Sequence, residues 1–284
     1  MNDNSIIVKG IKKEFGEKTI LNEINFTIQK GEIFGLLGPS GVGKTTLIKI
    51  LTGQIKATDG YASVLGKNVK DYKQDIYTNF GMVLDYTGLY ERLSCYDNLV
   101  FYASLFQLPK QKVIEALEDV GLGNEKKKPV HKLSKGMKQR LVIARALMHE
   151  PAILFLDEPT TGLDPYTAGI IHNLIKEEQA KGKTILLTTH NMEEASKLCN
   201  NVALLCDGDI VEYGEPEEIC RKYNYLNKIR LFTKSEKTVI LENSSKSANK
   251  IAEYFTREDV ESIHSTEPTL ETVFKELTGR NLAE

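Results

Sequence analysis

The chain has 284 residues, of which 41% are hydrophobic and 27% are charged, so it can form one large domain or one domain with an appendage. No stretch stays apolar for the length that a bilayer requires, and residues 1–5 lack the features of a signal peptide. We therefore expect a cytoplasmic protein unless a partner holds it at a membrane. The net charge of −2 gives no electrostatic reason to expect a nucleic-acid partner.

The first segment, residues 6–37, alternates short apolar runs with turns at residues 16–17 and 30–31, which predicts antiparallel strands. Phe15 stands beside the first turn. Its ring could stack on adenine, although core packing explains most phenylalanines. Residues 33–37 have the composition of a short buried strand, and residues 46–51 carry apolar side chains at helical spacing.

Between that strand and that helix lies Gly38-Pro-Ser-Gly-Val-Gly-Lys-Thr45, which matches the phosphate-binding loop pattern. The glycines let successive amides point inward, and the helix dipole adds partial positive charge where a triphosphate would lie. Lys44 suits the β- and γ-phosphates, and the Thr45 hydroxyl suits Mg²⁺. A chance glycine-rich turn is the alternative, and the agreement of strand, loop and helix argues against it. The predicted nucleotide-binding residues of this loop are Gly38, Pro39, Ser40, Gly41, Val42, Gly43, Lys44, Thr45 and Thr46.

The region from about residue 85 to 150 changes to helical spacing and predicts a helical insertion. Within it, Ser134 can cap a helix, and the free amides around Gly136 form a second anion site. One chain thus has one triphosphate cradle and a second phosphate-seeking helix end. The economical solution is a head-to-tail pair of like chains, with ATP held between the loop of one and Ser134 and Gly136 of the other.

The apolar strand 152–157 ends in two consecutive carboxylates, Asp157 and Glu158. Asp157 can hold Mg²⁺, and Glu158 can act as the base for the water that attacks the γ-phosphate. Solvated charge in an exposed turn is the alternative. His190 ends the next buried strand, 184–189, where it could hydrogen-bond a γ-phosphate oxygen or serve a structural purpose.

The remaining segments complete an alternating pattern of strands and helices, which predicts a largely parallel sheet with helices on its faces. A helix begins at Asp164-Pro165, another begins near Met192, and residues 202–213 form a hairpin. After Tyr223 the composition turns polar. We predict strands at 229–233, 238–241 and 260–264 and helices at 249–255 and 270–278, a small α+β appendage without a chemical motif, suited to packing or dimer contact.

The chain resembles the nucleotide-binding subunit of an ATP-binding-cassette (ABC) transporter over roughly residues 5–220. The matching motifs are the phosphate loop, Leu133-Ser-Lys-Gly-Met137, the Asp157-Glu158 strand, Gly162-Leu-Asp164 and His190. The resemblance implies a P-loop NTPase with an ABC domain at 1–222, including a helical subdomain at about 85–150, and an accessory region at 223–284. It implies ATP and Mg²⁺ as cofactors, Phe15 as the adenine-stacking residue, and Asp164 as a residue that communicates between sites.

The resemblance also implies two partners: a homodimer or dimer with a like subunit, and an integral membrane permease that holds the protein at the inner face of the cell membrane. Docking is expected near Asp85–Leu93, where Leu89 and Tyr90 are expected to be exposed; a helix-start loop is the alternative. The closing residues 267–274 and 277–279 resemble the exporter branch that handles drugs, antibiotics, lantibiotic peptides and polysaccharides.

The sequence departs from the family pattern in two places. Lys135 and Met137 replace a glycine and a glutamine of the usual signature. Asp85 stands where the family has a glutamine; it can still ligate Mg²⁺, but it adds negative charge beside a triphosphate and cannot donate a hydrogen bond. The expected function is ATP hydrolysis that drives a separate permease. The alternatives are a soluble ABC ATPase that acts on ribosomes or DNA and a metabolic P-loop kinase.

Overall fold

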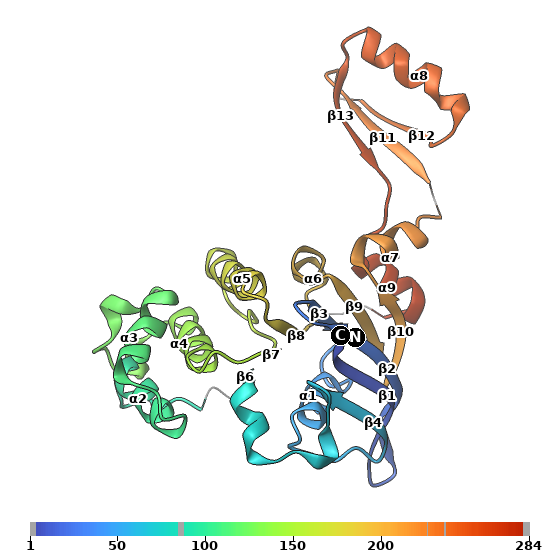
Figure 1. The fold of residues 1–284 in the computed structure, drawn as a ribbon. Coiled ribbons are helices and arrows are strands. Elements are labelled where there is room, and N and C mark those ends of the chain that lie inside the picture. The colour runs from blue at the N-terminus through green and yellow to red at the C-terminus, as the bar shows by residue number, and fades with distance from the viewer. Residues whose placement is uncertain (1–3, 85–87, 226, 236, 281–284) are drawn as a thin grey trace.

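The computed structural model describes residues 4–84, 88–225, 227–235 and 237–280 (Figure 1). Its first elements are β1 (Asn4–Phe15), β2 (Lys18–Gln29), β3 (Ile33–Leu37), α1 (Lys44–Leu51), β4 (Asp59–Val64), β5 (Lys67–Asn68), the short 3-10 helices η1 (Val69–Asp71) and η2 (Gln74–Asn79), and β6 (Phe80–Val83). The helical insertion follows with α2 (Cys95–Leu105), α3 (Lys110–Asp119), η3 (Gly123–Glu125), η4 (Val130–Lys132) and α4 (Lys135–Leu147).

The second half contains β7 (Ile153–Asp157), α5 (Pro165–Ala180), β8 (Thr184–Thr189), α6 (Met192–Leu198), β9 (Asn201–Cys206), β10 (Asp209–Gly214) and α7 (Pro216–Lys222). The chain ends with β11 (Lys228–Thr233), β12 (Thr238–Glu242), α8 (Ser245–Thr256), β13 (Val260–Ser265) and α9 (Leu270–Thr278). No described helix is long and apolar enough to cross a membrane.

The central sheet has the strand order β10-β9-β3-β8-β7-β6. Its strands from β9 to β6 pair in parallel, and β10 closes the edge as an antiparallel hairpin partner of β9. Every residue of β3, β7 and β8 is buried, because helices and a second sheet cover both faces. The predicted parallel sheet is confirmed, and so is the antiparallel N-terminal sheet, whose order is β2-β1-β4-β5.

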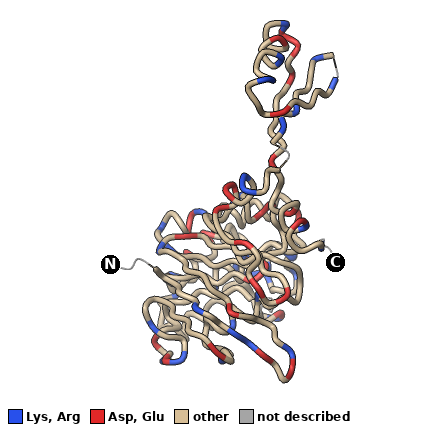
Figure 2. Tube along the Cα trace, turned by 90° about the vertical axis from the view of Figure 1, so that its right-hand side faces the viewer, with Lys and Arg blue, Asp and Glu red and all other residues tan. Residues whose placement is uncertain are grey.

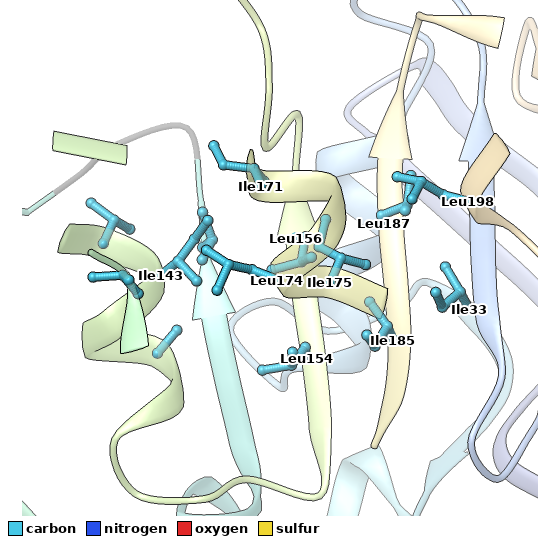
Figure 3. Close-up of a cluster of buried hydrophobic side chains, with 14 of the residues drawn as sticks. Ile33, Ile143, Leu154, Leu156, Ile171, Leu174, Ile175, Ile185, Leu187 and Leu198 are labelled. Carbon is cyan, nitrogen blue, oxygen red and sulfur yellow. The ribbon is translucent and has the colours of Figure 1, made fainter. Parts of the chain in front are cut away.

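Alternate residues of each central strand enter two different hydrophobic cores. Leu154 and Leu156 of β7 lie on the α5 side, where they face Leu174 and Ile175 (Figure 3). Ile153 and Phe155 point to the opposite side, toward a second core shared with α1 and the antiparallel sheet. This alternation follows from the two-residue period of a strand. It fixes the carboxyl ends of β3, β7 and β8 at one edge of a rigid scaffold.

The C-terminal segment contains two parts that pack differently. Strands β12, β11 and β13 form a three-stranded antiparallel sheet, which projects from the main body together with α8 (Figures 1 and 2). Helix α9 instead returns to the main body, where Leu270, Val273 and Phe274 are buried in the core beside α6 and α7. The predicted helix 270–278 therefore exists, but it packs with the central domain rather than with the appendage.

Candidate functional site

Two glycines of the loop between β3 and α1, Gly38 and Gly43, have no room for a side chain. A Cβ on Gly38 would lie 2.2 Å from the carbonyl oxygen of Leu205. Gly43 has φ of +112°, and a Cβ there would lie 2.7 Å from Leu21 of β2. The loop is thus held against both sheets while its backbone turns into the N-terminus of α1.

Lys44 lies at the mouth of this loop. Its side chain is only 5% exposed, and its ammonium donates hydrogen bonds to the carbonyl oxygens of Gly38 (2.7 Å) and Pro39 (3.0 Å). The same ammonium lies 3.2 Å from Oε1 of Glu158. A buried cation of this kind is well suited to receive an anionic ligand at this position.

Asp157 stands next to Thr45 at the end of β7. The Thr45 hydroxyl donates to Oδ2 of Asp157 at 2.7 Å, and the Thr188 hydroxyl donates to Oδ1. Asp157 is 3% exposed, so the structure brings a hydroxyl and a carboxylate oxygen together in a largely dry position. Hard oxygen donors of this kind would fit Mg²⁺. The structure places Thr45 and Asp157 side by side, and their role as metal ligands stays a prediction.

Glu158 is fixed on three sides. Its φ of +51° is uncommon for a residue with a side chain. Its Oε2 accepts hydrogen bonds from Thr161 Oγ1 and from Nδ1 of His190, both at 2.8 Å, while Oε1 faces Lys44. A carboxylate held in an unusual backbone conformation beside a histidine and a lysine is typical of an active site.

These side chains line one cavity of about 510 Å³. The opposite wall comes from the helical insertion, through Lys135, Lys138 and Gln139 of α4, and from Leu84 after β6. Sequence reasoning missed Leu84, Lys138, Gln139, Thr161 and Thr188. Thr161 could have been found from the sequence, because it lies between the carboxylates at the end of β7 and the cap of α5. The other missed residues have no sequence feature that marks them, and they are recognised only once the strands and helices are placed.

Comparison with known proteins identifies this arrangement. A family model described as "ABC transporter" matches residues 21–161. The fluoroquinolones export ATP-binding protein of Mycobacterium tuberculosis is 39% identical over 265 residues, which cover 91% of this chain and 87% of that protein. The chain belongs to the ABC transporter ATP-binding family. It is an ABC transporter ATPase, a protein that binds ATP.

Two solved structures have the same fold as this ABC ATPase. The cbiO1 protein of Clostridium perfringens, part of the ABC transporter complex cbiONQ, has a TM-score of 0.70 and 32% identity, with 78% of this chain and 95% of that chain covered. A dimeric ATP-binding cassette in a post-hydrolysis state with bound ADP and Pi has a TM-score of 0.66 and 27% identity, with 74% and 98% covered.

Only part of the signature segment, residues 133–137, faces the cavity of its own chain: Lys135 lines it, whereas Ser134 and Gly136 do not. Ser134 caps α4 by accepting the amide of Met137 at 3.2 Å, and Gly136 is buried against Thr167 of α5, so neither lines the cavity of its own chain. Asp164 caps α5: the amide and then the hydroxyl of Thr167 donate to its carboxylate, which lowers the pKa of Asp164.

Four predicted positions remain: Phe15, Asp85, Leu89 and Tyr90. Phe15 is 53% exposed at the end of β1, with Lys13 Nζ 4.6 Å from its ring centroid, and it does not line the cavity. Asp85 lies outside the described residues. Leu89, expected to be exposed, is partly buried and packs against the helical core, because it lies beside α2; Tyr90 is exposed as expected.

Proposed function

We propose that this ATPase dimerises around two Mg·ATP, hydrolyses them, and thereby drives a separate membrane permease that exports drugs, antibiotics or peptides. The observation that supports the proposal is that one cavity contains the phosphate loop, the adjacent oxygen donors of Thr45 and Asp157, and the Glu158 carboxylate with its hydrogen bond from His190. The export direction is supported by the resemblance to the M. tuberculosis export protein.

Within one subunit, we assign the roles by the atoms that face the cavity. The Lys44 ammonium neutralises the β- and γ-phosphates, and Thr45 and Asp157 hold Mg²⁺. When bound, Mg²⁺ offsets negative charge on the phosphate oxygens. Glu158 accepts the proton of the attacking water, and His190 orients that carboxylate and hydrogen-bonds the γ-phosphate. Phe15 stacks on the adenine from the β1–β2 hairpin, which touches Gly43 through Leu21.

The second half of each site belongs to the other subunit. Ser134 and Gly136 lie outside the cavity of their own chain, yet the N-terminus of α4 offers free amides and a positive dipole end. A head-to-tail dimer would place this helix end on the γ-phosphate bound by the other copy, and a related cassette has been solved as a dimer with ADP and Pi. Asp164, which joins this region to α5, communicates between the two sites.

The experiment that tests the catalytic assignment is Glu158→Gln. This change keeps the shape but removes the base, so we expect nucleotide binding within about threefold of wild type and turnover reduced by a factor of about 10² to 10⁴. It should also trap an ATP-bound dimer, visible by size-exclusion chromatography. Glu193→Gln is the matched control, because Glu193 is an exposed carboxylate that forms an ion pair with Lys197 on the surface of α6. Normal turnover by Glu158→Gln would remove Glu158 from this role.

The permease docks, in this proposal, on an apolar patch formed by Tyr90, Leu93, Phe101 and Leu105, which are 49%, 40%, 45% and 63% exposed. The rings of Tyr90, before α2, and Phe101, on α2, meet edge to face with their centroids 5.4 Å apart, which presents an aromatic surface. Docking there holds the ATPase at the inner face of the cell membrane. Replacing Phe101 with Asp should abolish co-purification with an integral membrane protein while leaving basal ATPase activity intact.

Co-purification of the wild-type protein with ribosomes or DNA, and with no membrane protein, would refute the permease as the partner of this ATPase.

Asp85 belongs to the same proposal as a Mg²⁺ ligand near the docking region. Asp85→Gln should change the stimulation of ATPase activity by the permease more than the affinity for ATP; equal stimulation of variant and parent would refute that assignment.

A further inference from the structure

Glu194 is a buried carboxylate that the mechanism above does not use. It lies in the first turn of α6 and is 2% exposed, yet each of its oxygens has a donor. Oε1 accepts hydrogen bonds from the Thr160 hydroxyl at 2.5 Å and from Nε2 of His172 at 2.8 Å. Oε2 accepts the Thr189 hydroxyl at 2.8 Å.

Burial of a carboxylate is costly unless such donors compensate for the lost water. Burial by itself would raise the pKa of Glu194, but the hydrogen bonds from His172, Thr160 and Thr189 outweigh it, and the net effect is a lowered pKa. The group is therefore an anion in the folded protein at neutral pH. An anion maintained in the interior by three separate elements acts as a fixed point between them.

Two of those elements hold Glu158. Thr160 is the neighbour of Thr161, whose hydroxyl donates to the Glu158 carboxylate at 2.8 Å. Thr189 is the neighbour of His190, whose Nδ1 lies 2.8 Å from the same carboxylate oxygen. The two side chains that orient the proposed base therefore lie one residue away from the two threonines bound to Glu194.

We propose that Glu194 is a positioning residue for ATP hydrolysis, which anchors the loop after β7 and the end of β8 to each other so that Thr161 and His190 hold Glu158 in its reactive orientation. This inference rests on the assignment of Glu158 as the base. His172 adds α5 to the same anchor, so the helix capped by Asp164 is tied to the group that positions Glu158. Glu194 touches neither ATP nor the attacking water.

The test is Glu194→Gln in the full-length protein. The amide offers one acceptor oxygen where the carboxylate offers two, so one threonine hydroxyl can no longer donate to residue 194, and the negative charge that strengthens all three bonds is removed. We expect kcat to fall about 10- to 100-fold, as for a small misplacement of a catalytic group, while the Kd for ATP stays within about twofold. Thr160→Val removes one anchor and leaves the rest of the cluster, and it should give a kcat loss of the same kind. Glu193→Gln, one residue away and exposed, should leave kcat unchanged.

A second measurement separates positioning from general damage. In a Glu158→Gln background, single-turnover hydrolysis should not slow by more than about twofold when Glu194→Gln is added, because the group that Glu194 positions is already disabled. Equal losses in both backgrounds, or wild-type kcat in both Glu194→Gln and Thr160→Val, would overturn the inference. Normal turnover by Glu158→Gln alone would instead refute the proposed function.

Discussion

Gly136, in the first turn of α4, allows two proposed requirements for a glycine to be tested separately: close packing against α5, and binding of phosphate by the backbone amides. The residue has an ordinary backbone conformation, but a Cβ added to it would lie 2.3 Å from Cγ2 of Thr167. Thr167 cannot simply rotate away, since its hydroxyl donates to Asp164 at 2.7 Å and its side chain is branched at Cβ. Gly136→Ala must therefore either separate α4 from α5 or break the cap of α5.

The magnitude follows from this overlap. Overpacking of a buried contact costs about 1–3 kcal/mol, and loss of an N-cap hydrogen bond costs a similar amount. For a chain of 284 residues, the average entropy of unfolding per residue converts this to a decrease in Tm of about 2–5 °C. Thr167→Ser removes the clashing methyl group but keeps the hydroxyl, so the double variant Gly136→Ala with Thr167→Ser should recover most of the lost stability.

Thermal denaturation and ATPase activity should respond differently to this pair. If the amides around Gly136 also bind the γ-phosphate of the other subunit, the added methyl still crowds that surface, and the double variant should remain at least about tenfold slower than Thr167→Ser alone. Gly169→Ala is the matched control: no atom lies within 4 Å of a Cβ there, and alanine in the middle of α5 should stabilise the protein by about 0.5–1 kcal/mol. An unchanged Tm for Gly136→Ala would refute the packing argument.

Three further outcomes follow from particular contacts. Lys44→Ala removes the only cation that faces both the loop carbonyls and Glu158 among the described cavity residues, so we expect at least about a 10²-fold loss of ATP affinity in a fluorescence titration, and retained affinity would contradict the role. The folded state lowers the pKa of Glu194 below the ordinary carboxyl value of 4.5, so this group stabilises the fold above that pH and the contribution is lost as the pH falls through the lower pKa of the folded state. The difference in unfolding free energy between wild type and Glu194→Gln should therefore shrink with falling pH, which urea titrations at pH 7 and pH 4 measure. Replacing residues 229–265 by a short linker should preserve ATPase activity. Phe274→Ala should instead lower the free energy of unfolding by about 3–5 kcal/mol in a urea titration, because Phe274 is fully buried in the main core. The reverse pattern would refute this division of the C-terminal segment.

The linker design relies on how the appendage is attached. The amide of Thr266 donates to the carbonyl of Lys228, and the amide of Lys228 donates to the Thr266 hydroxyl, both at 3.0 Å. The two ends of the appendage are therefore adjacent, and its removal need not displace α9. A deletion that also removes α9 is expected to destabilise the central domain, since Leu270, Val273 and Phe274 would leave the core.

The sequence predicted the elements and the chemistry where local patterns are sufficient. A continuous apolar run specifies a strand buried on both faces, and carboxyl ends of parallel strands meet at one edge; these two rules are enough to predict that Lys44, Asp157, Glu158 and His190 lie near one another. The spacing of apolar residues likewise predicted α9. An amphipathic pattern, however, indicates only that one face of a helix is buried, and does not indicate which part of the protein covers that face. The predicted grouping of 270–278 with the appendage was wrong in packing for that reason.

Only the tertiary structure decided the contacts between distant segments. The sequence places Thr161, His190 and Glu194 on different elements, and nothing in their spacing indicates that one carboxylate network joins them, because this depends on β7 and β8 lying side by side. The same holds for Gly136, whose neighbour Thr167 is 31 residues away and is reached only when α4 packs on α5. Local sequence fixes which groups can react, whereas the packing of the elements fixes what holds those groups in place.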